Sequence, residues 1–189
     1  MKTVSLSGSL RENVGKKDAK AQRAAGKVPC VIYGGKQQIH FSTEEINFKP
    51  ILFTPSSFII NVNVNGTEHL TILQDVQSHP VTDRILHVDF LEVDEKKPVV
   101  IAVPIKITGT SPGVLKGGKL VKKFRKLKVK ALLANLPDEI EINISDLDVN
   151  QSIKIGDLKM DNVEFLDLKG AVIVSVQATR NVEQTTPAK

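Results

Sequence analysis

Hydrophobic and polar residues alternate along several short stretches of the N-terminal half of the chain. A period of two is the pattern of strands with one buried and one solvated face. We expect such strands at residues 4–10, 28–33, 39–41, 57–64, 67–78 and 84–93. Two of them flank Asn65-Gly66, a dipeptide that favours the tight turn of a β-hairpin. The N-terminal half is therefore predicted to be mostly antiparallel β structure, closed or nearly closed.

One stretch of this half has the composition of a helix instead. Residues 15–25 are rich in Ala, Lys and Gln, and Gly26 follows them. With about 100° between successive residues, one helix face carries Lys16, Ala19, Lys20 and Arg23. The opposite face carries Ala21 and Ala25, which predicts close packing against a neighbour but little buried area. A second, shorter helix or turn is expected at residues 44–52.

The C-terminal half shows a second β pattern after a charged break at residues 94–98. Strand-like runs recur there at roughly ten-residue spacing, which is typical of a small β-sandwich or roll. Residues 181–189 are poor in apolar side chains and are expected to form a flexible tail. We therefore predict one β domain over residues 1–95 and a second β-rich domain over residues 96–180.

Composition excludes several classes of protein. The only cysteine, Cys30, lies in the apolar run "VPCVIY", so disulfides within the chain are excluded and a reducing cytoplasm is favoured. The N-terminal residues lack the apolar core of a signal peptide. No apolar run approaches the ~18 residues of a membrane span. The sequence is typical of a soluble cytoplasmic protein without a membrane partner.

The net charge of +5 is the sum of four segments whose net charges alternate in sign. Residues 1–36 carry a net charge of +6 and residues 37–94 one of −6. Residues 95–135 carry +10, and residues 136–189 carry −5. Basic blocks of this kind often face nucleic acid, although they are equally typical of solvated faces that balance one another in the fold.

Candidate chemistry is concentrated in "QDVQSHPVTDRILHVDF", residues 74–90. His87 and Asp89 are two residues apart, so they share one face of a strand, and pairing with the preceding strand would bring Gln77 beside them. A metal site is disfavoured because no H-x-H, H-E-x-x-H or cysteine partner is present. Ser78 and His79 are adjacent and point to opposite faces, which disfavours a nucleophile and base. We expect no catalytic residue, no metal, no cofactor and no small-molecule substrate.

A third interpretation is a polar face that contacts RNA. Gln, His and Asp side chains reach base edges and 2′-hydroxyls, and a helix with Lys and Arg on one face neutralises phosphates. Pairing of His87 with Asp89 on a barrel surface, without any ligand, remains the alternative at this point.

The same residues resemble the large-subunit ribosomal protein family L twenty-five, whose members bind 5S ribosomal RNA. The resemblance lies in "LRENVGKKDAKAQRAAGKVPCVIYGG", "QDVQSHP" and "ILHVDF", which occur in order at matching intervals. Residues 97–180 are similar to the extra C-terminal domain of the longer, CTC-type members, notably in "GVLKGGKL", "LPDEIEINISDL" and "IKIGDL". The resemblance covers almost the whole chain.

The resemblance implies a closed six-stranded β-barrel with one or two helices, followed by a β-rich roll or sandwich. It implies a structural component of the large subunit that binds 5S rRNA in the central protuberance, largely through a widened minor groove. The RNA-binding residues carried over by position are Arg11, Lys16, Lys20, Arg23, Tyr33, Gln77, His87 and Asp89. Lys20 and Arg23 would hold phosphates, while Gln77, His87 and Asp89 would contact bases or riboses.

Some positions depart from the family. Ala19 replaces a serine of some members, Lys20 replaces a common arginine, and Ala21 replaces a frequent basic residue, so the helix would make fewer phosphate contacts. The segment 119–130 holds six Lys and one Arg, which suits a neighbouring ribosomal protein or further rRNA as a partner. A stress-related RNA-binding protein of the same fold, acting partly off the ribosome, is the alternative function.

Overall fold

The computed structural model describes residues 1–35, 37–94 and 96–179. The tail predicted at 181–189 lies outside the described residues. The N-terminal elements are β1 (Lys2–Leu10), α1 (Lys16–Ala24), β2 (Lys27–Tyr33), β3 (Ile39–Glu44), the 3-10 turn η1 (Glu45–Phe48), α2 (Lys49–Leu52), β4 (Phe58–Val64), β5 (Thr67–Ser78) and β6 (Ile85–Glu92). The C-terminal elements are β7 (Val99–Thr108), α3 (Pro112–Leu115), β8 (Lys119–Lys122), β9 (Lys126–Ala131), η2 (Leu133–Asn135), β10 (Ile140–Asn143), β11 (Ser152–Lys154), η3 (Ile155–Asp157), β12 (Glu164–Phe165) and β13 (Val172–Gln177).

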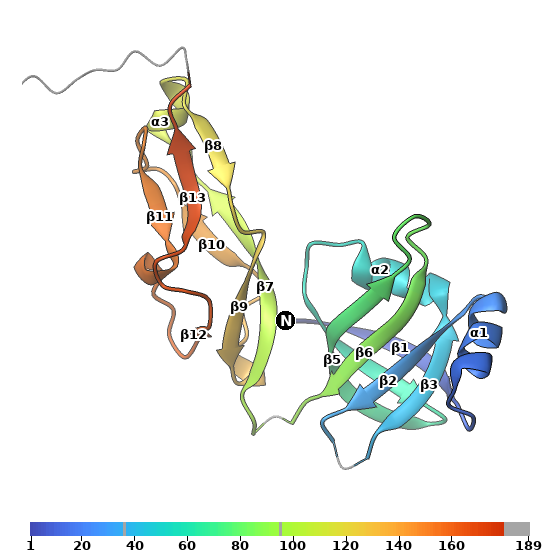
Figure 1. The fold of residues 1–189 in the computed structure, drawn as a ribbon. Coiled ribbons are helices and arrows are strands. Elements are labelled where there is room, and N and C mark those ends of the chain that lie inside the picture. Colours follow the sequence, from blue (N-terminus) through green and yellow to red (C-terminus); the bar gives the residue numbers. More distant parts are fainter. Residues whose placement is uncertain (36, 95, 180–189) are drawn as a thin grey trace, which may run out of the picture. The chain divides into compact units, whose positions relative to one another are not determined.

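The six N-terminal strands close into a barrel in the order β1-β3-β2-β6-β5-β4, with α1 on the outside (Figure 1). Four of its strand pairs are antiparallel, and two, β1 with β4 and β2 with β6, are parallel. The predicted closed six-stranded barrel is thus confirmed. Closure pairs both edges of the sheet, which removes the exposed strand edges that favour aggregation.

Alternating residues of the six strands fill the interior of the barrel. Phe41, Phe48 and Phe90 are fully buried, and the ring of Phe90 lies 5.7 Å from that of Phe41 and 6.4 Å from that of Phe48, centroid to centroid. A Cβ atom on Gly8 would lie 2.4 Å from Cδ2 of Phe41, so the glycine leaves room for this ring. Rings of this size contribute much of the buried apolar area of so small a barrel.

The hairpin predicted at Asn65-Gly66 connects β4 and β5. Both residues have positive φ, 51° and 89°, as a two-residue type I′ turn requires. The following strand pairs with β6 and contains a register shift between Leu73 and Asp75. A shift of this kind changes the side of the sheet to which the following side chains point.

Polar contacts, not an apolar stripe, hold α1 on the barrel. None of its residues is buried, and Ala21 and Ala25 are exposed to solvent. The prediction that these alanines pack against the neighbouring structure is therefore wrong. The half-buried side of the helix carries Asp18, Ala19, Gln22 and Arg23 instead. Asp18 and Arg23 each bind a group of the barrel. The side of the helix that carries them therefore faces the barrel, and the side that carries Ala21 and Ala25 faces solvent.

The C-terminal strands form two sheets, one in the order β10-β7-β9-β12 and one in the order β11-β13-β8. Along β9 the buried Leu127 and Val129 alternate with the exposed Lys126, Lys128 and Lys130. The basic segment is thus a strand with a charged outer face, and this part of the chain is β-rich as predicted. Between β7 and β8, Ser111 caps the single-turn helix α3 by accepting from the backbone N–H of Val114.

By contacts, the described residues divide into two compact units. The first contains Met1–Ile101 with Leu132–Asp138, and the second contains Ala102–Ala131 with the described residues from Glu139 onward. Independent folding of residues 1–95 and 96–180 remains a prediction.

Candidate nucleic-acid interface

The predicted strand residues lie on three neighbouring strands of the barrel. In the closed sheet β6 lies between β2 and β5. Gln77 is the register partner of His87, and Asp89 is the partner of both Asp75 and Val31. Tyr33 alternates with the buried Cys30 and Ile32, so it shares the outer side with Asp89. We call Tyr33, Asp75, Gln77, His87 and Asp89 the strand face.

His87 and Asp89 are joined by a hydrogen bond of 2.6 Å between Nδ1 and Oδ1. Their side chains are 31% and 29% exposed, so a ligand can reach both. A carboxylate at Nδ1 fixes the orientation of an imidazole and leaves Nε2 to face a partner. Within the described part of the chain, His87 Nε2 and Asp89 Oδ2 have no hydrogen-bond partner. The pairing of His87 with Asp89 on the barrel surface, which was the alternative prediction, therefore exists. It leaves one polar atom of each residue available for a ligand.

The strand face carries unbalanced negative charge. Asp75 and Asp89 are directly opposite each other on β5 and β6, and like charges at such positions repel. Burial raises the pKa of the Tyr33 hydroxyl, and the nearby carboxylates of Asp89 and Asp75 raise it further. Tyr33 thus keeps its proton and remains a donor at neutral pH. Donors from a ligand, such as 2′-hydroxyls or base amino groups, would relieve the repulsion.

Asp75 also belongs to the strand face, although the sequence did not assign this residue to it. Its spacing of two from Gln77 indicated a shared strand side, but its partner depended on the register with β6.

The helix brings basic side chains next to the strand face. Arg23 Nη1 donates to the carbonyl oxygen of Leu86 over 3.3 Å, and Leu86 directly precedes His87. Lys16 and Lys20 are exposed. Neither has an ion pair or side-chain hydrogen bond among the described residues, so both remain available for phosphates. The structure therefore splits the predicted basic face into two free lysines and one tethered arginine.

Arg11 differs from the other predicted contact residues. Its Nε donates to Oδ2 of Asp18 over 2.9 Å, Nη2 binds the same oxygen, and only 6% of its side chain is exposed. The guanidinium thus connects the end of β1 to the first turn of α1. Its present partner is a carboxylate of the protein itself, which makes it an anchor of the helix.

The sequence did not predict a second basic contact. Arg84 Nη2 lies 3.2 Å from Oε2 of Glu45 and 3.4 Å from the carbonyl oxygen of Arg23. These contacts connect the start of β6 to η1 and to the C-terminal end of α1. The partners are 39 and 61 residues apart in sequence, a separation that no local pattern reveals.

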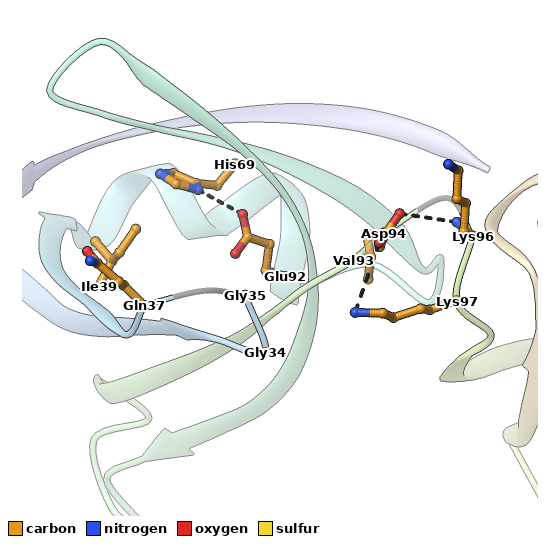
Figure 2. A pocket seen from close by; sticks show the side chains of 10 residues that line it. All are labelled: Gly34, Gly35, Gln37, Ile39, His69, Glu92, Val93, Asp94, Lys96 and Lys97. Atoms are coloured by element: carbon orange, nitrogen blue, oxygen red, sulfur yellow. Dashed lines mark hydrogen bonds and ion pairs between the residues drawn. The ribbon is translucent and has the colours of Figure 1, made fainter.

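A cavity of about 830 Å³ lies at the Gly34-Gly35 turn of the barrel unit (Figure 2). In it, Nδ1 of His69 on β5 lies 3.0 Å from Oε1 of Glu92 on β6. A Cβ atom on Gly35 would come within 1.5 Å of Oε2 of Glu92, so a larger residue there would displace the Glu92 carboxylate. The lining contains no Ser, Thr or Cys among the described residues. His69 and Glu92 connect neighbouring strands. The hydroxyl of Thr71, the register partner of Glu92, is buried and donates to the carbonyl oxygen of Ile60, so it is not available as a nucleophile.

In the part of the chain that the structure describes, no group of three or more His, Cys, Asp or Glu side chains is placed to hold a metal ion. Over the same residues, no helix is both long enough and apolar enough to cross a membrane.

A closed barrel with a basic helix beside a polar strand face, followed by a second β-rich part, defines a two-part β protein with a surface suited to nucleic acid. Residues 6–90 match the Ribosomal L25p family, and residues 98–180 match the C-terminal domain of ribosomal protein TL5.

Similar proteins span the whole chain. The large ribosomal subunit protein bL25 of Azobacteroides pseudotrichonymphae is 41% identical over 98% of both chains. That of Cytophaga hutchinsonii is 42% identical over 100% of this chain and 98% of its own. That of Porphyromonas gingivalis is 41% identical over 95% of each. The chain belongs to the bL25 family of large ribosomal subunit proteins, which confirms the resemblance seen in the sequence. These relatives are named as ribosomal components, and the protein is not an enzyme.

Proposed function

We propose that the protein is a structural component of the large ribosomal subunit in the cytoplasm and that its barrel binds 5S rRNA in the central protuberance. The observation that carries this proposal is the adjacency of the two surfaces. Arg23 of α1 donates to the residue directly before His87, so the helix and the strand face lie against one another. One RNA groove can then contact both at once.

The chemistry of the strand face suits the minor groove of RNA. That groove is wide and shallow in A-form helices and displays 2′-hydroxyls and base edges. Asp89 supplies an acceptor, His87 supplies the ring nitrogen left free by its bond to Asp89, and Gln77 supplies both a donor and an acceptor. Tyr33 adds a protonated hydroxyl. Such groups discriminate between ligands, because a mismatched partner leaves them unpaired.

The helix supplies affinity of another kind. Lys16 and Lys20 are exposed, and Arg23 is fixed by the carbonyl of Leu86. Cations at phosphates release counterions and bind any RNA duplex, with a steep dependence on salt. Affinity therefore comes mainly from α1, and specificity comes mainly from the strand face.

The C-terminal unit, residues 96–180 in the proposed division, would contact a neighbouring ribosomal protein or further rRNA. Lys126, Lys128 and Lys130 are exposed on one side of β9. Lys130 has a weak partner in Glu164 at 3.7 Å, on the adjacent strand β12. The exposed lysines give this side of the unit a positive charge that suits an anionic partner.

Two measurements test the proposal. In the first, large subunits washed at high salt are sedimented, and the protein is expected to stay with them. In the second, filter binding compares 5S rRNA with a scrambled RNA of equal length, and the expected result is tighter binding to 5S rRNA. A protein that washes off the subunits and binds both RNAs equally is not a 5S rRNA-binding ribosomal component.

A further inference from the structure

A hollow of about 350 Å³ lies next to the strand face, at the C-terminal end of α1. Its walls come from α1, the start of β2, the first residue of η1, the turn between β5 and β6, and the first residues of β6. Its polar lining consists of Arg23, Lys27, Glu45, His79, Thr82 and Arg84. The apolar Leu86 also lines it, and the next residue, His87, belongs to the strand face. A ligand that covers the strand face would therefore reach the hollow.

The charge of the hollow is positive. Three of its side chains, Arg23, Lys27 and Arg84, are basic, and Glu45 is its only acidic side chain. Glu45 is already occupied, since Oε2 accepts from Arg84 over 3.2 Å and Oε1 accepts from the backbone N–H of Ile85 over 3.1 Å. With three basic groups and one acidic group, the hollow has a net charge of +2 when His79 is neutral.

The donors in the hollow are already arranged before any ligand binds. The Nδ1 atom of His79 accepts from the backbone N–H groups of Val81 and Thr82, each over 3.3 Å. An accepting Nδ1 places the proton of the neutral ring on Nε2, so His79 is a donor there. Arg84 is fixed by Glu45 and by the carbonyl of Arg23. Lys27 has no ion pair or side-chain hydrogen bond among the described residues, so its ammonium group is available.

We infer that this hollow binds a phosphate group of the RNA whose groove is contacted by the strand face. The inference rests on the proposed function and extends it to Lys27, His79 and Arg84. A net positive hollow with donors on several sides matches the charge and the acceptor oxygens of a phosphodiester. Because Arg23 lines the hollow and also joins α1 to β6, a phosphate bound there would fix the register of the RNA along the barrel.

The test uses the full-length protein and filter binding to 5S rRNA at several salt concentrations. Lys27→Gln is expected to lower affinity about 3- to 10-fold and to reduce the slope of log affinity against log salt by about one or less. Lys27→Arg, which keeps the charge, is expected to restore most of the affinity. His79→Ala is expected to weaken binding, since it removes the Nε2 donor. The matched control is Lys49→Gln, an exposed lysine on α2 outside the hollow.

Each outcome decides the inference. The inference is supported if Lys27→Gln lowers the affinity for 5S rRNA, Lys27→Arg restores it and Lys49→Gln leaves it unchanged. An unchanged affinity of Lys27→Gln for 5S rRNA would overturn it. Equal losses of affinity with Lys27→Gln and Lys49→Gln would overturn it as well. If wild-type protein discriminates 5S from scrambled RNA while Lys27→Gln binds normally, the proposed function stands and only the inference fails.

Free phosphate is the other source of the same chemistry, and inorganic phosphate is the probe for it. Titration of the folded protein, followed by the NMR shifts of the His79 ring, reports occupation of the hollow. Phosphate binding that leaves the affinity for RNA unchanged, even at saturation, would assign the hollow to a free anion and overturn the inference.

Discussion

Arg11 and Asp18 form an ion pair in which two guanidinium nitrogens of Arg11 bind one carboxylate oxygen of Asp18. The arginine is almost completely buried, and the pair joins the end of β1 to the first turn of α1. The helix has no buried residue of its own, so it is held by this contact, by the bond from Arg23 to Leu86 and by the bond from Arg84 to the Arg23 carbonyl oxygen. The position of the lysines proposed to bind phosphates therefore depends on a residue that is itself mostly shielded from a ligand.

Replacement of Arg11 by lysine tests this anchoring role. The Arg11→Lys variant keeps the positive charge but loses the planar fork that binds Asp18 through two nitrogens. We expect a loss of about 1–3 kcal/mol in the stability of the helix against local opening. Hydrogen exchange of the amides of α1 should accelerate, while exchange in the barrel core stays slow. Unchanged exchange in α1 would show that Arg11 does not anchor the helix.

The exposed helix lysines should act on any RNA duplex. Lys20→Ala is expected to weaken binding to 5S rRNA and to an unrelated duplex by similar factors, because phosphate contacts carry no sequence information. The slope of log affinity against log salt should fall by about one or less. Filter binding over a range of salt concentrations measures both. A loss confined to 5S rRNA would contradict the assignment of Lys20 to phosphates.

The thiol of Cys30 should be inert in the folded barrel. Burial raises the pKa of this thiol well above its ordinary value, and the Asp89 carboxylate adds to the rise against the opposing effect of Arg11. The unfolded chain loses this proton at lower pH than the folded chain, so folding stability falls as pH rises above about 8.5, the ordinary thiol value. Denaturant unfolding at pH 7 and pH 9.5 should show the decrease, and Cys30→Ala should reduce it. Rapid alkylation of the native protein would contradict the buried thiol.

The barrel should fold without the rest of the chain. All six of its strands lie within residues 1–92, and their pairing closes the sheet. A fragment of residues 1–95 is expected to fold and to retain 5S rRNA binding. Circular dichroism and filter binding of this fragment provide the test. A fragment of residues 1–101, which contains the whole N-terminal segment of the first compact unit, is the matched comparison. An unfolded 1–95 fragment, or a folded one that does not bind, would contradict the proposed division.

Local patterns predicted the local features of the barrel. The hairpin at Asn65-Gly66 followed from two residues that tolerate positive φ, and α1 followed from composition and Gly26. The shared face of His87 and Asp89 followed from their spacing on one strand. Such features depend on only a few neighbouring residues, so the sequence alone is sufficient to predict them.

Features that depend on distant partners were not predictable in this way. Residues 2–8 pair in parallel with residues 58–64, more than fifty positions away, and no periodicity reveals this. The side of α1 that faces the barrel was misjudged because the deciding partners, Arg11 and the Leu86 carbonyl, are polar. Asp75 and Arg84 escaped assignment because register and tertiary contacts determine their positions.

The central claim, that the strand face recognises RNA, is tested most directly by Asp89→Ala. Asp89 is directly opposite Asp75, so its loss removes a like-charge repulsion and one negative charge near the phosphates of the proposed RNA ligand. Simple electrostatics therefore predicts equal or tighter binding, while recognition by the carboxylate predicts weaker binding, by roughly 1–3 kcal/mol. Filter binding should show this loss with 5S rRNA and almost no change with scrambled RNA, and Asp146→Ala, an exposed aspartate of the C-terminal unit, is the control. A folded Asp89→Ala protein that binds 5S rRNA as well as the wild type, or better, would contradict the claim and leave His87 and Asp89 as a surface pair.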